Sequence, residues 1–99
     1  MKQDIVPEPI VFEWDKGNID KNLKKHGIEN REAEEVFLGD PLISEDTEHS
    51  KIEKRYQCLG KTDKGKYLFI SFTMRNDKIR IISVRNMDKR EKETYAKET

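Results

Sequence analysis

The chain has 99 residues, enough for one small domain, and only 33% of them are hydrophobic, so its core must be modest. Twenty basic residues balance twenty acidic ones, and a net charge of zero argues against a uniformly basic nucleic-acid-binding protein. The longest apolar runs are far too short to cross a bilayer, and the first residues lack the basic and apolar segments of a signal peptide. We therefore expect a cytoplasmic protein that does not contact a membrane.

Charge is divided unevenly between the two halves of the chain. Residues 1–50 hold six Lys or Arg against thirteen Asp or Glu, a net charge of −7, whereas residues 51–99 hold fourteen against seven, a net charge of +7. If the halves form separate layers, the basic layer can bind phosphate groups even on a neutral molecule. The alternative is that acidic helices pair with a basic sheet inside the monomer.

The first forty residues predict a short strand and two helices. Residues 1–9 form an N-terminal extension, and Ile10–Trp14 has the composition of a strand, with Asp15 as a possible cap of the following helix. That first helix ends at about His26, where a glycine follows, and Ile19, Leu23 and His26 share its inward face. A second helix covers about Asn30–Leu38, with Ala33, Val36 and Phe37 inward. We expect the two helices to form a hairpin.

The periodicity after the second helix is that of strands. Four segments alternate in this way, "LISED", "KRYQCLG", "KYLFISFT" and "KIRIISVR", and the turn sequences "KTDKGK" and "MRNDK" separate the last three. Because these connections are short, they predict an antiparallel meander, with Leu68, Ile70 and Phe72 on the face that the helices cover. Asp88 and Glu91 have the spacing of a capping box and predict a last helix.

Together these elements predict an α+β fold in a single domain that spans residues 10–99. A helical hairpin packs on an antiparallel four-stranded meander sheet, with a possible extra N-terminal strand and a C-terminal helix. The opposite face of the sheet carries a mixture of aromatic and polar side chains, such as Phe69 and Thr73, and this is the face left for a ligand.

Two arginines interrupt the β-branched run "KIRIISVRN". Arginine suits a phosphate or carboxylate partner, because its planar guanidinium offers two parallel donors. Arg80 and Arg85 are an odd number of residues apart, so a regular strand would point them to opposite faces unless a bulge intervenes or Arg85 lies past the strand end. We favour the strand end. The alternative for Arg80 is an ion pair with a glutamate of the helical layer.

The pieces "FEWD", "NLKKHGI", "EAEEVF", "DPL", "RYQCLG" and "IRIISVRNMDKREKETY" follow in this order over roughly residues 10–97, and together they resemble the BrnT toxin family. The resemblance implies a RelE-like fold and the ribonuclease toxin of a type II toxin–antitoxin pair, which inhibits translation and is silenced by a cognate DNA-binding antitoxin, BrnA-like, encoded beside it. Two departures, Glu29 at a position where a Ser-like helix cap is common and Asn86 where a further basic residue often occurs, affect capping and RNA affinity more than the chemistry.

Cleaving RNA without a metal requires that the 2′-hydroxyl is deprotonated, the charge of the phosphorane is stabilised and the leaving 5′-oxygen is protonated. Arginines suit the middle task, and Arg55, Arg80 and Arg85 lie on the second and fourth strands of the predicted meander, which can bring them to one face. The two histidines are far apart and the single cysteine, Cys58, has the surroundings of a core residue, so no zinc-type ligand set is predicted and no cofactor is expected.

The candidates for proton transfer are His26, Glu91, Tyr95 and Lys25. His26 has the side chain best suited to the role, but a structural histidine at the end of an amphipathic helix is the alternative. Glu91 has the alternative role of a capping partner, and Tyr95 that of an anchor for the last helix. The resemblance to RelE-type toxins implies a C-terminal arginine and tyrosine beside the scissile phosphate, which favours Arg90 and Tyr95.

Basic residues beside these candidates, Lys25, Lys54, Lys89 and Arg90, are expected to bind the RNA backbone. His49 lies in the polar sequence "EDTEHSK" and is predicted to be a loop residue. The antitoxin is expected to bring acidic or helical segments to the basic half. A second hypothesis is a non-catalytic module that uses the basic sheet only to bind nucleic acid or an acidic protein. No pattern in the chain indicates the oligomeric state of the free protein.

Overall fold

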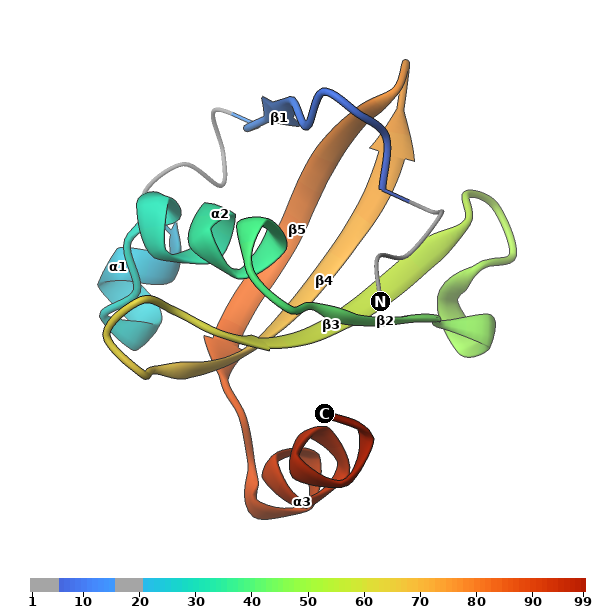
Figure 1. Ribbon diagram of the computed structural model, residues 1–99. Helices are drawn as coiled ribbons and strands as arrows, with labels where there is room; N and C mark the ends of the chain where they lie inside the picture. The colour runs from blue at the N-terminus through green and yellow to red at the C-terminus, as the bar shows by residue number, and fades with distance from the viewer. Residues whose placement is uncertain (1–5, 16–20) are drawn as a thin grey trace.

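The structure is a computed structural model that describes residues 6–15 and 21–99. Its described residues form a five-stranded sheet with two helices on one side and a C-terminal helix at one end, which confirms the α+β class (Figure 1). The elements in chain order are β1 (Phe12–Glu13), α1 (Lys21–His26), α2 (Asn30–Leu38), β2 (Leu42–Glu45), the 3₁₀ turn η1 (Thr47–His49), β3 (Arg55–Lys61), β4 (Tyr67–Arg75), β5 (Lys78–Asn86) and α3 (Lys89–Glu98). In the described part of the chain, no helix is long and apolar enough to cross a membrane.

The sheet has the strand order β1-β5-β4-β3-β2. Strands β2 to β5 form the antiparallel meander that the turn sequences predict. The possible extra strand is present as β1, which pairs in parallel with β5 through Phe12 opposite Ile79 and Glu13 opposite Arg80. It is shorter than the five residues predicted, since only two residues pair. The tight turn between β4 and β5 places Asn76 and Asp77 at φ values of 53° and 61°, the left-handed region that two-residue hairpins require.

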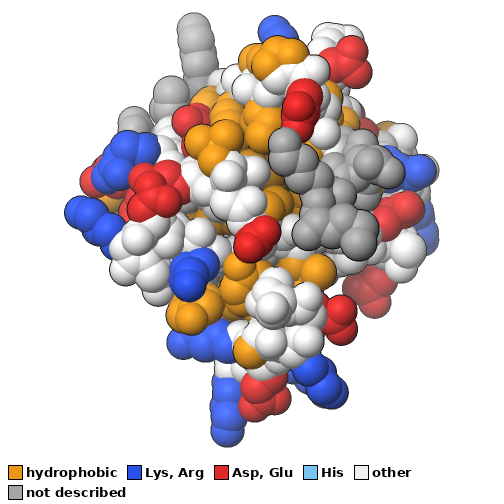
Figure 2. All heavy atoms as spheres, in the orientation of Figure 1, with side chains coloured by type: hydrophobic (Ala, Val, Ile, Leu, Met, Phe, Trp, Pro, Cys, Tyr) orange, Lys and Arg blue, Asp and Glu red, His pale blue; other side chains and the backbone are white. Residues whose placement is uncertain are grey.

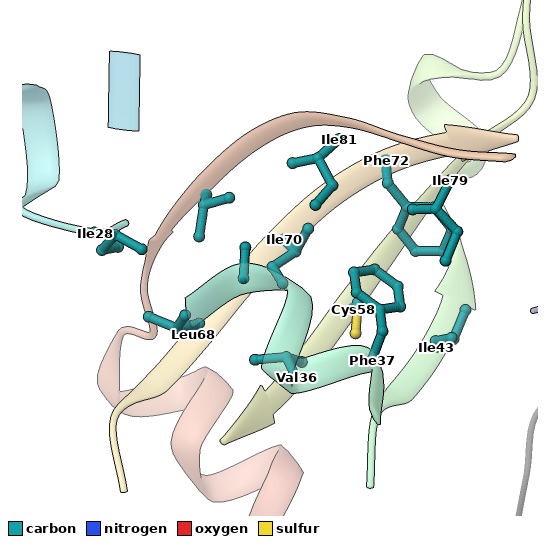
Figure 3. Packing of buried hydrophobic residues seen from close by; sticks show 12 residues of the cluster. Ile28, Val36, Phe37, Ile43, Cys58, Leu68, Ile70, Phe72, Ile79 and Ile81 are labelled. Carbon is teal, nitrogen blue, oxygen red and sulfur yellow. The ribbon is translucent and has the colours of Figure 1, made fainter. Parts of the chain in front are cut away.

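Helix α2 covers one face of the sheet and forms the core with it. Phe37 points from the helix toward Cys58 (Figure 3), its ring meets that of Phe72 edge to face at 5.0 Å, and Val36 belongs to the same core cluster. The Cys58 side chain is fully buried, and burial raises the pKa of its thiol, as befits a core residue. Gly60 lets β3 approach the helix closely, because a Cβ there would lie 2.3 Å from Cγ1 of Val36.

The predicted helical hairpin needs correction. Helix α1 lies against β5 and α2 lies against β3 and β4, and contacts between the described parts of the two helices are few. Leu23, predicted to face inward, is 51% exposed, whereas Ile28 in the link between the helices is fully buried. In this region Ile28 of the link, rather than Leu23 of α1, packs into the core, and each helix packs on the sheet separately. The predicted start of the first helix, with Ile19, lies outside the described residues.

Helix α3 begins with the predicted capping box. Asp88 accepts a hydrogen bond from the Glu91 backbone N–H at 2.8 Å, and Glu91 accepts one from the Asp88 backbone N–H at 2.9 Å. The helix lies at the opposite end of the structure from the β4–β5 turn (Figure 1), where the Tyr95 ring contacts Tyr67. Tyr67 alternates with the buried residues of β4, so α3 meets the sheet on the face away from α2. We call this face the open face.

Basic and acidic side chains are interspersed on the α2 side of the molecule rather than segregated (Figure 2). Ion pairs join the acidic half of the chain to the basic half, with Lys66 3.0 Å from Glu32 and Lys54 3.9 Å from Glu45. These pairs compensate charge within the chain, but they do not join acidic helices to the sheet as predicted, since Glu45 lies in β2 and both lysines precede strands.

Candidate functional site

A bulge in β5 controls which side chains reach the open face. Ser71 of β4 pairs with Ser83, but the next residue, Phe72, pairs with Ile81, so Ile82 is an extra residue in β5. An extra residue reverses the alternation of side chains beyond it. The two arginines of this strand, an odd number of residues apart, therefore point to the same face.

Register across three strands brings the arginines onto the open face. Thr73 of β4 lies opposite Arg55 of β3 on one side and opposite Arg80 of β5 on the other, while Arg85 lies opposite Phe69. Because Arg85 is paired inside β5, the expectation that it lies past the strand end is wrong, and the bulge is the correct explanation. Neighbouring strands are about 4.8 Å apart, so the Arg55 and Arg80 backbones are about 10 Å apart, and Arg85 lies four residues, roughly 13 Å, farther along the sheet.

Carboxylates from the N-terminal segment engage Arg80. Its Nη2 donates to Oδ2 of Asp15 at 2.7 Å, and its Nη1 lies 3.8 Å from Oε1 of Glu13. Parallel pairing of β1 with β5 creates this contact, since it places Glu13 opposite Arg80. The alternative that Arg80 pairs with a glutamate of the helical layer is therefore wrong in its partner, because the carboxylates that Arg80 binds come from β1 and the residues after it.

Arg85 is held at the α3 end of the open face. Its two terminal nitrogens donate to the two carboxylate oxygens of Glu91, each at 2.8 Å, and its guanidinium lies 4.1 Å from the centre of the Phe69 ring. The hydrogen bonds to Glu91 and its negative charge outweigh burial and raise the pKa of Arg85. Glu91 therefore caps α3 and also joins it to β5.

Tyr95 anchors α3 to the rest of the protein. Its side chain is 8% exposed, its hydroxyl donates to the Asp40 carbonyl oxygen at 3.1 Å, and its ring contacts Tyr67. Burial is the main reason that the pKa of Tyr95 is raised. The alternative role of an anchor, inferred from the sequence, matches these contacts.

The basic candidates divide between two ends of the molecule. Lys54 precedes Arg55, and Lys89 and Arg90 form the exposed first turn of α3. Arg90 also lines a groove of about 370 Å³ between α3 and the open face, together with Leu42, Gln57, Leu59, Phe69 and Thr94. The carboxylates of Glu91 and Glu98 also line this groove, so its polar lining carries both signs of charge over an apolar floor. Lys25 and His26 are exposed at the end of α1, which lies against β5.

A histidine that the sequence analysis assigned to a loop lies beside Arg55. Nδ1 of His49 is 2.9 Å from Oδ2 of Asp46, and His49 and Arg55 line the same depression of about 360 Å³. The one sequence signal for this pair is the i, i+3 spacing of Asp46 and His49 in a polar segment. Its nearness to Arg55 depends on the pairing of β2 with β3, which local spacing does not encode.

Potential metal ligands do not cluster in the described residues. In residues 6–15 and 21–99, no group of three or more His, Cys, Asp and Glu side chains is arranged to hold a metal ion. The reactive groups near the open face are instead the guanidinium groups and the imidazole of His49 with the Asp46 carboxylate. Thr73 is buried, and its hydroxyl donates to the Lys54 carbonyl oxygen at 2.7 Å.

Comparison with known families identifies the chain. A model of the BrnT toxin family, described as the ribonuclease toxin, BrnT, of type II toxin–antitoxin systems, matches residues 14–91. The match includes β3 to β5 and the start of α3, and it covers most of the chain, so the chain belongs to this family. No curated protein sequence matches it.

Proposed function

We propose that this member of the BrnT family is a metal-independent endoribonuclease toxin, which cleaves RNA on the open face by attack of a 2′-hydroxyl on the adjacent phosphate. The observation that carries this proposal is the placement of Arg55 and Arg80 on either side of Thr73. Thr73 lies near the β4–β5 turn, so both arginines are at that end of the sheet, and α3 lies at the opposite end (Figure 1). Family membership supplies the ribonuclease class, and the arginines supply a place for the scissile phosphate.

The role of these arginines follows from the charge of the transition state. In-line attack produces a phosphorane that carries more negative charge than the phosphodiester, and fixed donors at that position lower the barrier. Within the described part of the chain the Arg55 guanidinium has no carboxylate partner, whereas Arg80 has Asp15 and Glu13. Arg55 is therefore available to the phosphate directly, and at Arg80 the phosphate exchanges with a carboxylate.

The other sequence-predicted residues are proposed to bind and position RNA rather than to react. Arg85 and Glu91 fix α3 on the sheet, and Tyr95 anchors its second half. Helix α3 then presents Lys89 and Arg90 to the strand of RNA that leaves the arginine pair. Lys54 adds positive charge at the other end, next to Arg55.

Regulation follows from the family. A type II toxin has a protein antitoxin as its partner, and we propose that this antitoxin neutralises the toxin by placing acidic or helical segments over the open face. Carboxylates suit this role because Arg80 already pairs with two carboxylates of its own chain. Cleavage of messenger RNA in the cytoplasm would stop translation when the antitoxin is lost.

The test is an RNA cleavage assay in EDTA with analysis of the product ends. Attack by the 2′-hydroxyl leaves a 2′,3′-cyclic phosphate or a 3′-phosphate, and no metal is needed. The double variant Arg55→Ala/Arg80→Ala, purified in the same way, controls for contaminating nuclease. Products with 3′-hydroxyl ends, or complete dependence on Mg²⁺, would rule out this mechanism. RNA binding without cleavage would support the non-catalytic module instead.

A further inference from the structure

We propose that His49, held by Asp46, is the group that removes the proton from the attacking 2′-hydroxyl at the Arg55 end of the open face. This assignment rests on the proposed ribonuclease function, for which it names the missing proton acceptor. It arises from the structure, since the sequence analysis placed His49 in a loop and named other residues for the role.

The geometry gives each atom of the pair a distinct task. Nδ1 of His49 lies 2.9 Å from Oδ2 of Asp46. A carboxylate at Nδ1 fixes the proton there, so that Nε2 is left as the basic atom. The Asp46 side chain is 11% exposed and that of His49 is 59% exposed. The Asp46 carboxylate is thus nearly buried and fixed in place, whereas the His49 imidazole is accessible to a substrate.

Backbone contacts fix this pair relative to Arg55. The Asp46 N–H donates to the Arg55 carbonyl oxygen at 2.9 Å. The Ser50 hydroxyl oxygen accepts a hydrogen bond from the Arg55 N–H at 3.0 Å, and the hydroxyl donates to the Asp46 carbonyl oxygen at 2.6 Å. The segment that carries His49 is therefore fastened to the strand that carries Arg55, and a phosphate at Arg55 has an imidazole beside it.

The charge around the imidazole is mixed. Burial favours a raised pKa for Asp46, but hydrogen bonds from His49 and Gln57 and the charge of His49 outweigh it and lower the pKa, so the carboxylate is ionised at neutral pH. The depression that His49 lines also contains the charged residues Glu48, Lys51, Glu53 and Arg55. Its two cations can hold the phosphate while Asp46 holds the ring in one orientation through the contact to Nδ1.

Two of the other proton-transfer candidates, Glu91 and Tyr95, are engaged at the α3 end of the sheet, while Lys25 and His26 are exposed at the end of α1. Both carboxylate oxygens of Glu91 accept from Arg85, and the Tyr95 hydroxyl donates to a carbonyl oxygen. The imidazole of His49, in contrast, shares a depression with Arg55 of the open face. Among the described residues it therefore has both the chemistry and the position for the task.

The proposed step is balanced without a further reactant. The 2′-oxygen forms a bond to phosphorus as its proton passes to Nε2 of His49, and the bond from phosphorus to the 5′-oxygen breaks with its electron pair remaining on that oxygen. The 5′-oxygen takes a proton from water, and the imidazolium returns its proton to solvent. The products are a 2′,3′-cyclic phosphate and a 5′-hydroxyl, with Arg55 beside the phosphorane.

The experiment compares His49→Asn with the wild-type protein on a short RNA that the wild-type protein cleaves in EDTA. The asparagine amide can still donate to Asp46 but cannot accept a proton. We expect the single-turnover rate to fall about 10²-fold or more, the melting temperature to change by less than about 4 °C, and affinity for the same RNA with a 2′-O-methyl group at the cleavage site to be unchanged.

The pH profile separates a catalytic from a structural role. In the wild-type protein the rate should fall on acidification through the range where histidine titrates, and His49→Asn should lose this limb. Asp46→Asn should also lower the rate, because the carboxylate that holds the proton on Nδ1 of His49 is lost. His26→Asn, at the chain's other histidine, is the matched comparison. Retention of the limb in His49→Asn, or its loss in His26→Asn alone, overturns the assignment. An inactive wild-type protein overturns the proposed function as well.

Discussion

Replacing Arg55 with lysine tests the proposed phosphate site most directly. The substitution keeps the positive charge but replaces a planar, two-pronged donor with a single ammonium group. In the described part of the chain the Arg55 guanidinium has no carboxylate partner. The change therefore removes the two parallel donors that a phosphate would bind, and it breaks no ion pair of the fold.

We expect Arg55→Lys to lower the cleavage rate without lowering stability, because Arg55 is proposed to contact the ligand and makes no ion pair in the described part of the fold. Loss of one donor that stabilises a developing anion lowers the rate by about 10² to 10³, or about 2.7–4 kcal/mol in transition-state stabilisation. A substitution that breaks no buried contact changes the free energy of unfolding by less than about 0.5 kcal/mol. We therefore expect Arg55→Lys to melt like the wild-type protein, to bind RNA with similar affinity at low salt, and to cleave at least 10²-fold more slowly.

Arg85→Lys is the matched control for this prediction, because it makes the same chemical change at the other end of the open face. There the guanidinium binds both oxygens of Glu91 and lies over the Phe69 ring. Losing this arrangement should cost about 1 kcal/mol of stability, or roughly 4–8 °C in melting temperature, with cleavage reduced only in proportion to the folded protein.

The assay is single-turnover cleavage in EDTA, measured beside thermal unfolding on both lysine variants. If Arg55→Lys remains folded and cleaves within about threefold of the wild-type rate, the phosphate is not bound where Arg55 and Arg80 flank Thr73. If Arg85→Lys instead loses cleavage at unchanged stability, the reacting phosphate lies at the α3 end, and the division of the open face argued above is wrong.

Three further predictions concern the scaffold. Gly60→Ala should destabilise the fold by about 1–3 kcal/mol, because the new methyl group would lie 2.3 Å from Cγ1 of Val36; the double variant with Val36→Ala should regain part of the loss in melting temperature. Tyr95→Phe removes the hydrogen bond to the Asp40 carbonyl and should lower stability by about 0.5–1.5 kcal/mol while leaving the cleavage rate of the folded protein intact. The pKa of Glu32 is lowered from 4.5, chiefly by a backbone N–H at the start of α2, so its stabilising effect is present at neutral pH and is lost as the pH falls through the lowered value. Chemical denaturation should therefore show Glu32→Gln to be less stable than the wild-type protein at pH 7, with the difference vanishing in strong acid, and a constant difference would contradict this reasoning.

The parts of the fold that depend on local spacing could be predicted from the sequence. Alternation of apolar residues located β2 to β5, and the capping box of Asp88 and Glu91 located the start of α3. Three buried residues of α2 follow the helical repeat that was predicted. These signals are local because each depends on residues within a few positions of one another, and hydrophobic burial then enforces them.

The bulge in β5 could not be predicted in the same way. Ile82 lies in a run of β-branched residues, and nothing in "RIISV" indicates which isoleucine is the extra one. The bulge is a property of the pairing between β4 and β5, yet it decides whether Arg80 and Arg85 share a face. Spacing alone showed that a bulge or a strand end was needed, and only the register distinguished the two.

Contacts between distant segments account for the other omissions. Asp15 meets Arg80 because β1 pairs in parallel with β5 across 65 positions of sequence separation. His49 and Arg55 line one depression because η1 and the loop after it turn the chain from β2 back into β3. Contacts made by parallel pairing or by loops produce no periodic pattern in a single sequence. The sequence therefore identified residues with suitable chemistry but did not predict which residues lie next to them.

These contacts explain how the unequal charges of the two halves of the chain are compensated in the folded protein. The acidic half supplies partners to the basic half, as Asp15 does for Arg80 and Glu32 does for Lys66. Much of the positive charge is therefore compensated inside the free protein, and a long-range field that attracts any polyanion is weak. Affinity for RNA must then depend on a few uncompensated groups close to the scissile phosphate, Arg55 first among them. A site built in this way is specific for a phosphate held in one position, which is what a ribonuclease needs and what a general nucleic-acid-binding surface does not.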